Sequence, residues 1–420
     1  MELSFLPETL RTQLAEVGEV DVLVGIPSFN NARTIGHVVR AVHAGFAKYF
    51  ADSKCLLINS DGGSSDGTPE VVSSATIGDY GTLLAAHPLR TVHKIITPYH
   101  GIPGKGSALR LVFGAAQALK ARACAVVDAD LRSITPEWID LLISPQLKEG
   151  KEFVAPLYHR HKYDGTITNS IVYPLTRALY GARVRQPIGG DFGFSGRLAE
   201  YYLTHDVWGS DVARFGIDIW MTTTAITGGF EVCQSFLGAK IHDTKDPGVD
   251  LSAMLVQVVS ALFSLMETHT RRWRKVSGSQ PVRSFGFEYT VGLEPVKVNV
   301  ERMVGIFKTG VRDLSEVWER ALAPDTYRQV AVLAAVPAEK FRFPAELWVR
   351  VMFDFAVAYH VYALNRDHLL RALTPLYLGR TASFVLETAE ADAEEVEAIL
   401  EALCLEYERQ KPYLIERWGP

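Results

Sequence analysis

The stretch CAVVDAD (residues 124–130) is a short apolar run that ends in two aspartates. Four similar β-rich runs lie around it in the chain: DVLVGIP (21–27), CLLINSD (55–61), VHKIITP (92–98) and FVAPLY (153–158). Segments with helical spacing separate them, including a stripe of Ile35, Val38, Val39, Val42 and Phe46. Near-continuous apolar strands that alternate with amphipathic helices predict a mostly parallel sheet with helices on both faces. We therefore expect an α/β, Rossmann-like fold.

The later part of the chain has a different pattern. The 420 residues exceed what one core usually serves, since single cores stop growing near ~250–300 residues. The segment SGSQPVRSFGFEYTVGLEP (277–295) is rich in Gly, Ser and Pro, and helical patterns dominate after it. We predict an α/β domain over 1–290, with halves over about 20–135 and 136–276, and a helical C-terminal region over 291–420.

Composition excludes several classes of protein. With 43 basic and 48 acidic residues the net charge is −5, which gives no reason to expect a nucleic-acid partner. The four cysteines have neither disulfide nor zinc spacing. The first 20 residues do not resemble a secretory signal, so we expect a cytoplasmic protein. The longest apolar stretch (251–266) is shorter than the ~20 residues of a membrane span and predicts a buried helix.

Polar segments follow the predicted strands. In open α/β sheets, ligands bind beyond the carboxyl ends of the strands. The segments there are PSFNNA (27–32), SDGGSSDGT (60–68), GIPGKGSAL (101–109) and Asp128-Ala129-Asp130. Together, in this order, they predict a ligand site at one edge of the sheet.

The acidic pair suggests a metal. Alternation along a strand points Asp128 and Asp130 to the same side, so two carboxylates can converge on one cation, and the small Ala129 leaves room. Mg²⁺ or Mn²⁺ held there would bridge the phosphates of a nucleoside diphosphate and neutralise the charge that develops as it leaves. Aspartates at strand ends are also common as turn formers and caps, so the pair depends on its neighbours for its meaning.

Two of the other segments suit a nucleotide. Asp61 is suited to contact a base or ribose, whereas we expect Asp66 to cap the helix that begins near Thr68. Lys105 lies between two glycines that let the backbone approach a phosphate. The segment lacks the spacing of a P-loop, and a solvated surface lysine is the alternative.

In this order, the four segments resemble those of the GT-A glycosyltransferases, in particular the retaining group with glucosyl-3-phosphoglycerate synthase and glucosylglycerate synthase. The resemblance covers roughly residues 20–275. Five later segments share it: PLYHRHKYDGTITN (156–169), YPLTRALYG (173–181), QPIGGDFGFSG (186–196), FGIDIW (215–220) and AKIHD (239–243). It implies a GT-A fold, in which residues 20–135 are the nucleotide-binding half and residues 136–276 the acceptor half.

The resemblance also implies roles for single residues. It implies metal ligands at Asp130 and His242. It implies donor contacts from Pro27, Phe29, Asn31, Asp61, Gly104, Lys105, Asp128 and Ala129. It places Gly190, Asp191 and Asp218 beside the transferred sugar, where the family commonly has Glu instead of either aspartate. It assigns the acceptor to Thr166, Thr168 and Asn169; this loop lacks the arginine of phosphoglycerate-using relatives, which favours free glycerate.

We therefore expect a metal-dependent, retaining hexosyltransferase with Mg²⁺ or Mn²⁺. It would move a hexose, in first place glucose, from GDP-, ADP- or UDP-glucose to D-glycerate and form the compatible solute glucosylglycerate. The alternatives are transfer to 3-phosphoglycerate and mannosyl transfer to glycerate. We also expect a homodimer. Front-face attack, with the acceptor proton passing to the departing phosphate oxygen, is the preferred mechanism.

Three other interpretations remain open. A sugar nucleotidyltransferase needs a Gly-rich signature directly after the first strand, where this chain has PSFNNA (27–32). A catalytically inert sugar- or nucleotide-binding regulator would not need the acidic residues. Transfer to a lipid or polysaccharide would give the segment 341–364 a role as an amphipathic membrane contact, although packing inside the protein also explains such a face.

Overall fold

The computed structural model describes residues 3–75, 93–99, 103–241, 251–289 and 296–419. The chain divides into two compact units. Unit 1 comprises residues 1–159, 184–243 and 282–292, and unit 2 comprises 160–183, 244–281 and 293–420. This division differs from the single boundary predicted near residue 290, because two earlier segments belong to the second unit.

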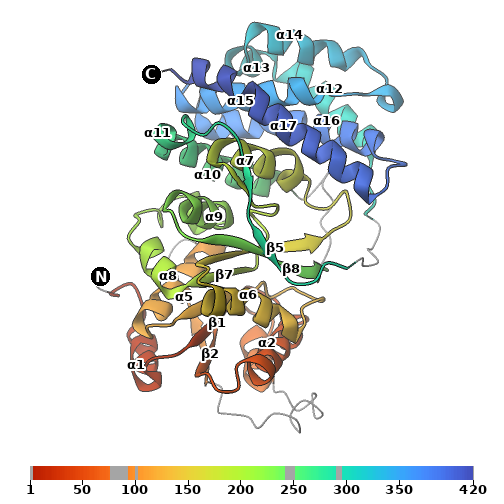
Figure 1. The fold of residues 1–420 in the computed structure, drawn as a ribbon. Helices are drawn as coiled ribbons and strands as arrows, with labels where there is room; N and C mark the ends of the chain where they lie inside the picture. Colours follow the sequence, from red (N-terminus) through yellow and green to blue (C-terminus); the bar gives the residue numbers. More distant parts are fainter. Residues whose placement is uncertain (1–2, 76–92, 100–102, 242–250, 290–295, 420) are drawn as a thin grey trace. The chain divides into compact units, whose positions relative to one another are not determined.

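Unit 1 is built on an eight-stranded sheet with the order β10-β8-β5-β7-β4-β1-β2-β3 (Figure 1). The strands are β1 (Val22–Ser28), β2 (Cys55–Asp61), β3 (His93–Pro98), β4 (Ala123–Val126), β5 (Phe153–His159), β7 (Phe192–Ser195), β8 (Val232–Ala239) and β10 (Arg283–Phe285). Among them, β7 alone runs antiparallel to its neighbours, β4 and β5. The mostly parallel sheet expected from the apolar runs is confirmed.

Helices cover both faces of this sheet. The helices of unit 1 are α1 (Glu8–Val17), α2 (Ile35–Tyr49), α3 (Thr68–Ser74), α5 (Lys105–Ala118), α6 (Pro136–Glu149), α8 (Gly196–Leu203) and α9 (Ile217–Thr227). On one face, α2 and α6 share a core with Val24 of β1 and Leu57 of β2. On the other face α5 lies so close to β1 that a Cβ at Gly25 would come within 2.7 Å of Val112. The glycine therefore lets this helix approach the sheet.

The strand β4 is shorter than the sequence suggests. It ends at Val126, and residues 129 and 130 form a turn. Pairing with β1 ends where the Val127 amide donates to Gly25 O at 3.1 Å, and the next amide, of Asp128, donates to the side chain of Asp191 at 2.7 Å. The expectation that strand alternation points both aspartates to one side is therefore wrong.

In sequence, Thr135 followed by Pro136 is typical of a helix start with a capping hydroxyl. Helix α6 does begin at Pro136, and it continues to Glu149. Thr135 occupies the N-cap position, but its side chain accepts no hydrogen bond from the backbone. The fixed backbone angle of the proline at the first helical position still favours the start of the helix.

Unit 2 is mainly helical (Figure 1). Its helices are η2 (Thr168–Val172, a π-helix), α7 (Tyr173–Tyr180), α10 (Ser252–Thr268), α11 (Thr270–Trp273), α12 (Val300–Asp313), α13 (Ser315–Ala321), α14 (Pro324–Val332), η4 (Leu333–Ala335), η5 (Ala338–Lys340), α15 (Ala345–His360), α16 (Arg366–Glu387) and α17 (Ala393–Trp418). A small parallel pair, β6 (Ala182–Arg183) and β9 (Gln280–Pro281), accompanies them.

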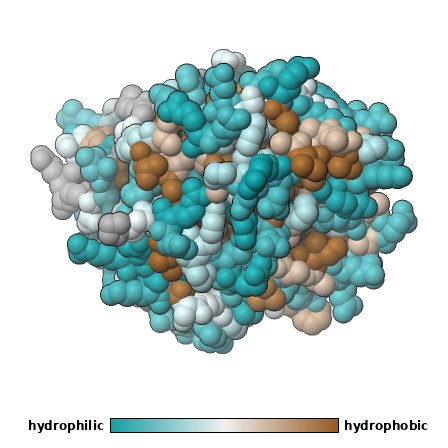
Figure 2. Space-filling model, turned by 90° about the horizontal axis from the view of Figure 1, so that it is seen from above, coloured by the Kyte–Doolittle hydropathy of each residue, from teal (hydrophilic) through white to brown (hydrophobic). Residues whose placement is uncertain are grey.

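The apolar segments of unit 2 form its interior. Trp348 and Phe353 of α15 are fully buried, so the segment 341–364 is mostly core. Figure 2 shows a face on which hydrophilic residues predominate and the hydrophobic ones form separate small areas. Within the described ranges, no helix has the length and hydropathy that crossing a bilayer requires. The burial of most of the segment 341–364 favours the alternative that its apolar face packs inside unit 2.

Buried charges explain why the segment 160–183 belongs with the C-terminal helices. The fully buried guanidinium of Arg177, in α7, pairs with Glu401 at 2.5 Å and with Glu408 at 2.7 Å, both in α17. Lys411 of α17 donates to the carbonyl oxygens of Ala178 at 2.9 Å and Val276 at 2.7 Å. These contacts tie α7 to the last helix of the chain.

Candidate functional site

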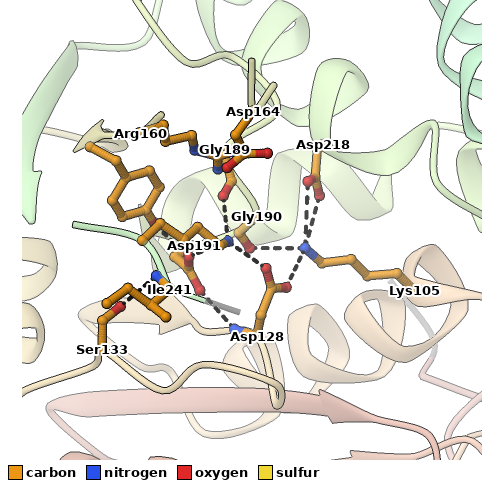
Figure 3. Close-up of polar contacts among 12 residues, drawn as sticks. Lys105, Asp128, Ser133, Arg160, Asp164, Gly189, Gly190, Asp191, Asp218 and Ile241 are labelled. Carbon is orange, nitrogen blue, oxygen red and sulfur yellow. Dashed lines mark hydrogen bonds and ion pairs between the residues drawn. The ribbon is translucent and has the colours of Figure 1, made fainter. Parts of the chain in front are cut away.

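Five charged side chains from distant parts of unit 1 meet beyond the carboxyl ends of β4 and β8 (Figure 3). Each comes from a position directly before or after a strand or near the start of a helix. We call the group the aspartate–lysine cluster, and its members are Lys105, Asp128, Asp191, Asp218 and Lys240. The prediction of a polar site at this edge of the sheet is supported by their convergence.

Asp128 is the centre of the cluster. Its Oδ1 lies 2.8 Å from the ammonium group of Lys105, and its Oδ2 lies 2.7 Å from that of Lys240. Burial opposes ionisation, but the charges of Lys105 and Lys240 outweigh it and hold the pKa of Asp128 well below its usual range. Both carboxylate oxygens therefore pair with lysines, and in this arrangement neither is positioned to coordinate a metal ion.

Lys105 begins α5 and makes three kinds of contact. Besides Asp128, its ammonium group donates to Gly190 O at 2.9 Å and lies 3.3 Å from Asp218. Burial lowers the pKa of Lys105, but the neighbouring carboxylates, Asp128 first, raise it above its ordinary value. Lys105 is thus an ion-paired lysine with a side chain only 14% exposed, and the alternative of a solvated surface lysine is wrong.

Asp191 is fully buried at the turn before β7. Its Oδ1 accepts the Asp128 amide at 2.7 Å, and its Oδ2 accepts hydrogen bonds from Lys240 at 2.8 Å and from the hydroxyl of Tyr158. Because protein donors occupy both oxygens, Asp191 holds the turn in place here. Its predicted direct contact with sugar hydroxyls would require a rearrangement.

Asp218 lies in the first turn of α9 and is only 9% exposed. Its Oδ1 accepts no hydrogen bond within the described part of the chain, but it lies 3.3 Å from the ammonium group of Lys105. Burial raises the pKa of Asp218, against the opposing charge of Lys105. A buried carboxylate held by such long contacts is costly, so Asp218 is the member of the cluster best suited to receive a hydroxyl group from a ligand.

The two glycines before Asp191 are required by their surroundings. Gly190 has φ +93°, and a Cβ there would lie 2.2 Å from Oδ2 of Asp128 and 2.8 Å from Nζ of Lys240. The carbonyl oxygen of Gly189 accepts a hydrogen bond from Lys240 at 2.8 Å. Each glycine carbonyl thus faces one lysine of the cluster.

The loops after β1 and β2 are organised by aspartates. Asp61 is buried, and its carboxylate accepts the amides of Gly63 at 2.9 Å and Ser64 at 2.8 Å. Asp66 accepts the amides of Thr68 at 3.1 Å and Ala32 at 3.0 Å. The expected structural role of Asp66 is confirmed, whereas Asp61 points its carboxylate into its own loop and its contact with a nucleotide stays a prediction.

These loops present an aromatic ring to solvent. Phe29 is 61% exposed, and a Cβ at Gly62 would lie 3.1 Å both from its ring and from the hydroxyl of Tyr99. The Phe29 amide donates to the side chain of Asn31 at 2.9 Å, while Gly104 donates to the Tyr99 hydroxyl at 3.0 Å. Such a fixed, exposed ring can stack a flat base. Pro27, also predicted, is half-buried within β1.

The predicted metal ligands are only partly described. Asp130 is half-buried in the turn after β4, next to Ala129, whose carbonyl accepts a hydrogen bond from Thr34 at 2.8 Å. His242 lies outside the described residues. Within them, no group of three or more His, Cys, Asp or Glu residues could hold a metal ion. Mg²⁺ commonly binds one or two carboxylates together with phosphate oxygens, so Asp130 fits an ion whose other ligands come from a diphosphate.

The predicted acceptor residues lie in unit 2. The hydroxyl of Thr166 is 2.5 Å from that of Tyr377, and Thr168 starts η2. Thr166 and Asn169 line a small pocket, partly open to solvent, together with residues of α16 and α17 that include Arg380. Lys162 donates to the carbonyl oxygens of Thr388 and Ala391 and so serves the end of α16, not a phosphate.

Two residues of the site were not predicted from the sequence. Lys240 completes the aspartate–lysine cluster, and the hydroxyl of Tyr158 donates to Asp191. Lys240 had a visible signal, since it is a charged residue at the end of a buried strand. Tyr158 had none, because a tyrosine within an apolar strand is most often a core residue.

Comparisons with known proteins give a likeness in structure alone. No model of a protein family matches the chain, and no curated protein matches it. Similar solved structures include glucosyl-3-phosphoglycerate synthase from Mycobacterium tuberculosis with Mn²⁺, uridine diphosphate and glucosyl-3-phosphoglycerate, at 23% identity and a TM-score of 0.45, covering 62% of this chain and 85% of that one.

Two further structures of that enzyme give similar values. The complex with Mn²⁺, UDP-glucose and phosphoglyceric acid has 23% identity, a TM-score of 0.44 and coverage of 62% of this chain and 86% of that one. The complex with Mg²⁺ and uridine diphosphate has 20% identity, a TM-score of 0.43 and coverage of 62% and 84%. They belong to the group that the sequence resembles, but at this similarity we take no ligand, metal or activity from them.

Proposed function

We propose that this protein is a divalent-metal-dependent glycosyltransferase that moves a hexose from a nucleoside-diphosphate sugar to a small hydroxy acid. The observation that carries the proposal is the aspartate–lysine cluster. It sets two ammonium groups and a buried carboxylate, that of Asp218, whose contacts with Lys105 are long, beyond the strand ends of a mostly parallel sheet. Anionic phosphates and sugar hydroxyls are the groups that such a site complements.

The donor nucleotide would bind at the loops after β1 and β2. The exposed ring of Phe29 offers a stacking surface for the base, and the Asp61 loop fixes the backbone beside it. The diphosphate would extend toward Gly104 and Lys105, where α5 begins and the positive end of its helix dipole favours an anion. The sequence resemblance supports the same assignment.

The metal site would consist of Asp130 and His242, completed by the diphosphate. Ile241, the residue before His242, donates its amide to Ser133 at 2.9 Å and accepts that of Arg132 at 2.9 Å. These bonds bring the chain that leads to His242 beside the segment that follows Asp130. When bound, Mg²⁺ or Mn²⁺ would neutralise charge on the departing diphosphate.

The residues around the sugar would act by position and charge. Asp218 would accept a hydrogen bond from a sugar hydroxyl, and Lys105 would face the negative charge on the phosphate. The bond between the anomeric carbon and the phosphate oxygen breaks as the acceptor hydroxyl forms a new bond on the same face. The hydroxyl proton passes to the departing phosphate oxygen. The configuration is thereby retained, and no general acid is needed.

For the acceptor we propose D-glycerate and therefore glucosylglycerate as product, with 3-phosphoglycerate as the alternative acceptor and mannosyl transfer as the alternative reaction. Thr166, Thr168 and Asn169 would contribute hydroxyl and amide groups to hold it. We further propose that the protein works as a cytoplasmic homodimer. Light scattering after size-exclusion chromatography would test the dimer.

A substrate panel tests the proposal. GDP-, ADP- and UDP-glucose, with GDP-mannose for comparison, are each combined with D-glycerate or 3-phosphoglycerate, with and without Mg²⁺ or Mn²⁺. We expect acceptor-dependent release of nucleoside diphosphate with metal only, and a new glycoside by mass spectrometry. Release of pyrophosphate from a nucleoside triphosphate and a sugar 1-phosphate would instead identify a nucleotidyltransferase.

A further inference from the structure

Lys240 is the most enclosed charge of the aspartate–lysine cluster. Its side chain is 4% exposed, and its ammonium group donates to three acceptors: Oδ2 of Asp128 at 2.7 Å, Oδ2 of Asp191 at 2.8 Å and the carbonyl oxygen of Gly189 at 2.8 Å. A lysine ammonium group has three N–H donors, so these contacts match its full capacity. The ring of Tyr158 lies 5.3 Å from the same nitrogen.

Lys105 differs from Lys240 in position and surroundings. It stands at the first position of α5, directly after Gly104, and its side chain is 14% exposed. One of its carboxylate partners, Asp218, lies at 3.3 Å, which is longer than the contacts of Lys240. Lys105 can therefore replace its contact with Asp218 by one with a phosphate, and this would cost less interaction energy than the same exchange at Lys240.

We propose that Lys240 is a positioning residue that does not touch the substrate. It fixes Asp128 and the Gly189–Gly190–Asp191 turn in one geometry, and this leaves Lys105 as the ammonium group of the cluster that turns to the donor diphosphate. The two lysines thus have different tasks. The inference rests on the proposed glycosyltransferase function.

The packing around Lys240 leaves little room for another side chain. A Cβ at Gly190 would already lie 2.8 Å from its nitrogen, and its three acceptors come from two separate segments of unit 1. A larger, planar guanidinium group cannot meet the same three acceptors in this space. Methionine keeps similar length without charge and leaves two buried carboxylates short of one donor each.

The test compares Lys240→Met, Lys240→Arg and Lys105→Met in the full-length chain. For each variant, kcat and donor KM are measured, and the Kd of the nucleoside diphosphate with Mn²⁺ is measured by calorimetry. Lys120→Met is the matched control, because this surface lysine of unit 1 has a side chain that is 72% exposed. Thermal unfolding shows which variants are folded.

We expect Lys240→Met to lower kcat about 100-fold, the usual effect of a small misplacement in an active site, and to change the nucleotide Kd less than about threefold. Lys105→Met should instead raise both donor KM and the nucleotide Kd about tenfold or more. Lys240→Arg should not restore kcat. A side chain with a merely structural role would lower the unfolding temperature but leave the kcat of the folded protein unchanged.

A double variant keeps the inference open to refutation if Lys240→Met folds poorly. Lys240→Met combined with Asp191→Asn removes a positive and a negative charge together. The decrease in kcat of this double variant, expressed as an activation free energy, should therefore be smaller than the sum of the decreases in the two single variants. The inference is overturned if Lys240→Met weakens nucleotide binding as much as Lys105→Met, or if kcat is unchanged. An inactive wild-type protein across the whole donor panel would instead refute the proposed function.

Discussion

The aspartate–lysine cluster contains three carboxylates and two ammonium groups, so one negative charge is in excess when all five are ionised. Burial raises the pKa of Asp218. The positive charge of Lys105 lowers it by less, so the pKa stays above its ordinary value. A carboxyl group whose pKa is raised in the folded state favours folding when protonated. Its contribution to stability is therefore lost as the pH rises through that pKa.

Replacement of Asp218 by Asn should reveal this dependence. Wild-type stability should fall relative to that of Asp218→Asn as the pH increases from acid toward neutral, because the amide has no charge to bury. Transfer activity should fall about 10- to 100-fold, since the amide is a weaker acceptor for a sugar hydroxyl. Thermal unfolding and kcat between pH 4 and 8 measure both. Equal pH profiles of stability would contradict the prediction.

Gly190 provides a second test at this scale. In Gly190→Ala, the new methyl group would lie 2.2 Å from Oδ2 of Asp128, at a φ of +93°. We expect a loss of about 100-fold in kcat and of about 1–3 kcal/mol in the free energy of unfolding. Gly150→Ala is the control, because Gly150 also has positive φ but no atom within 4 Å of the added Cβ. The control should lose stability alone.

Asp130 tests the metal site. Asp130→Ala should lower kcat by about two orders of magnitude in Mg²⁺, because the ion would lose its carboxylate ligand. Addition of EDTA should abolish wild-type turnover, and Mn²⁺ should restore it. Near-normal turnover of the variant at saturating Mg²⁺ would refute the assignment. Asp128→Ala is a useful comparison, because its carboxylate is ion-paired to lysines.

The residue types of the cluster were largely predictable, whereas their pairing was not. Lys105, Asp128, Asp191 and Asp218 were all expected at one site, and they do converge. The Asp-x-Asp spacing gave no sign that both oxygens of Asp128 would contact lysines, because one partner is 23 residues away and the other 112. Pairing over such distances is decided by the packing of the whole sheet.

At the scale of single elements, the apolar runs predicted the strands better than their ends. The runs at 21–27, 55–61 and 92–98 match β1, β2 and β3 within one residue at either end. By contrast, β4 stops four residues before the end of its run. Where a strand ends depends on the partner available to its amides, and the Asp128 amide pairs with Asp191, 63 residues later. Composition alone does not contain this information.

Helix α7 offers a prediction at this scale. Arg177→Met would leave Glu401 and Glu408 of α17 without their buried partner. We expect a loss of about 3–5 kcal/mol in the free energy of unfolding, since removing one partner leaves uncompensated charge. Urea denaturation followed by circular dichroism measures it. The exposed pair of Arg328 and Asp325 is the control, and Arg328→Met should cost less than about 1 kcal/mol.

At the scale of the whole molecule, the chain passes five times between the two units. The sequence suggested one crossing, near 290, because composition changes there. The earlier crossings are not marked by a change in composition, since α7 and α10 are as apolar as helices of unit 1. Their partners in unit 2, α17 and α16, come more than a hundred residues later.

A truncated chain tests this organisation. If residues 1–290 were an independent domain, the fragment would fold and keep its cooperative unfolding. We expect instead that it is insoluble or unfolds without a cooperative transition, because α7 and α10 lose the helices that bury their apolar faces. Solubility after expression and thermal unfolding decide this. A well-folded fragment would support the boundary near 290.

The ion pair between Arg177 and Glu401 cannot form until both residues have been synthesised on the ribosome. The two residues are 224 positions apart, so at roughly 5–20 residues per second the arginine waits roughly 10–45 seconds for its partner. During that interval the newly made α7 segment keeps its charge in water and its apolar face uncovered. Unit 2 therefore cannot complete its folding until α17 has emerged, and the nascent chain needs protection from aggregation until then.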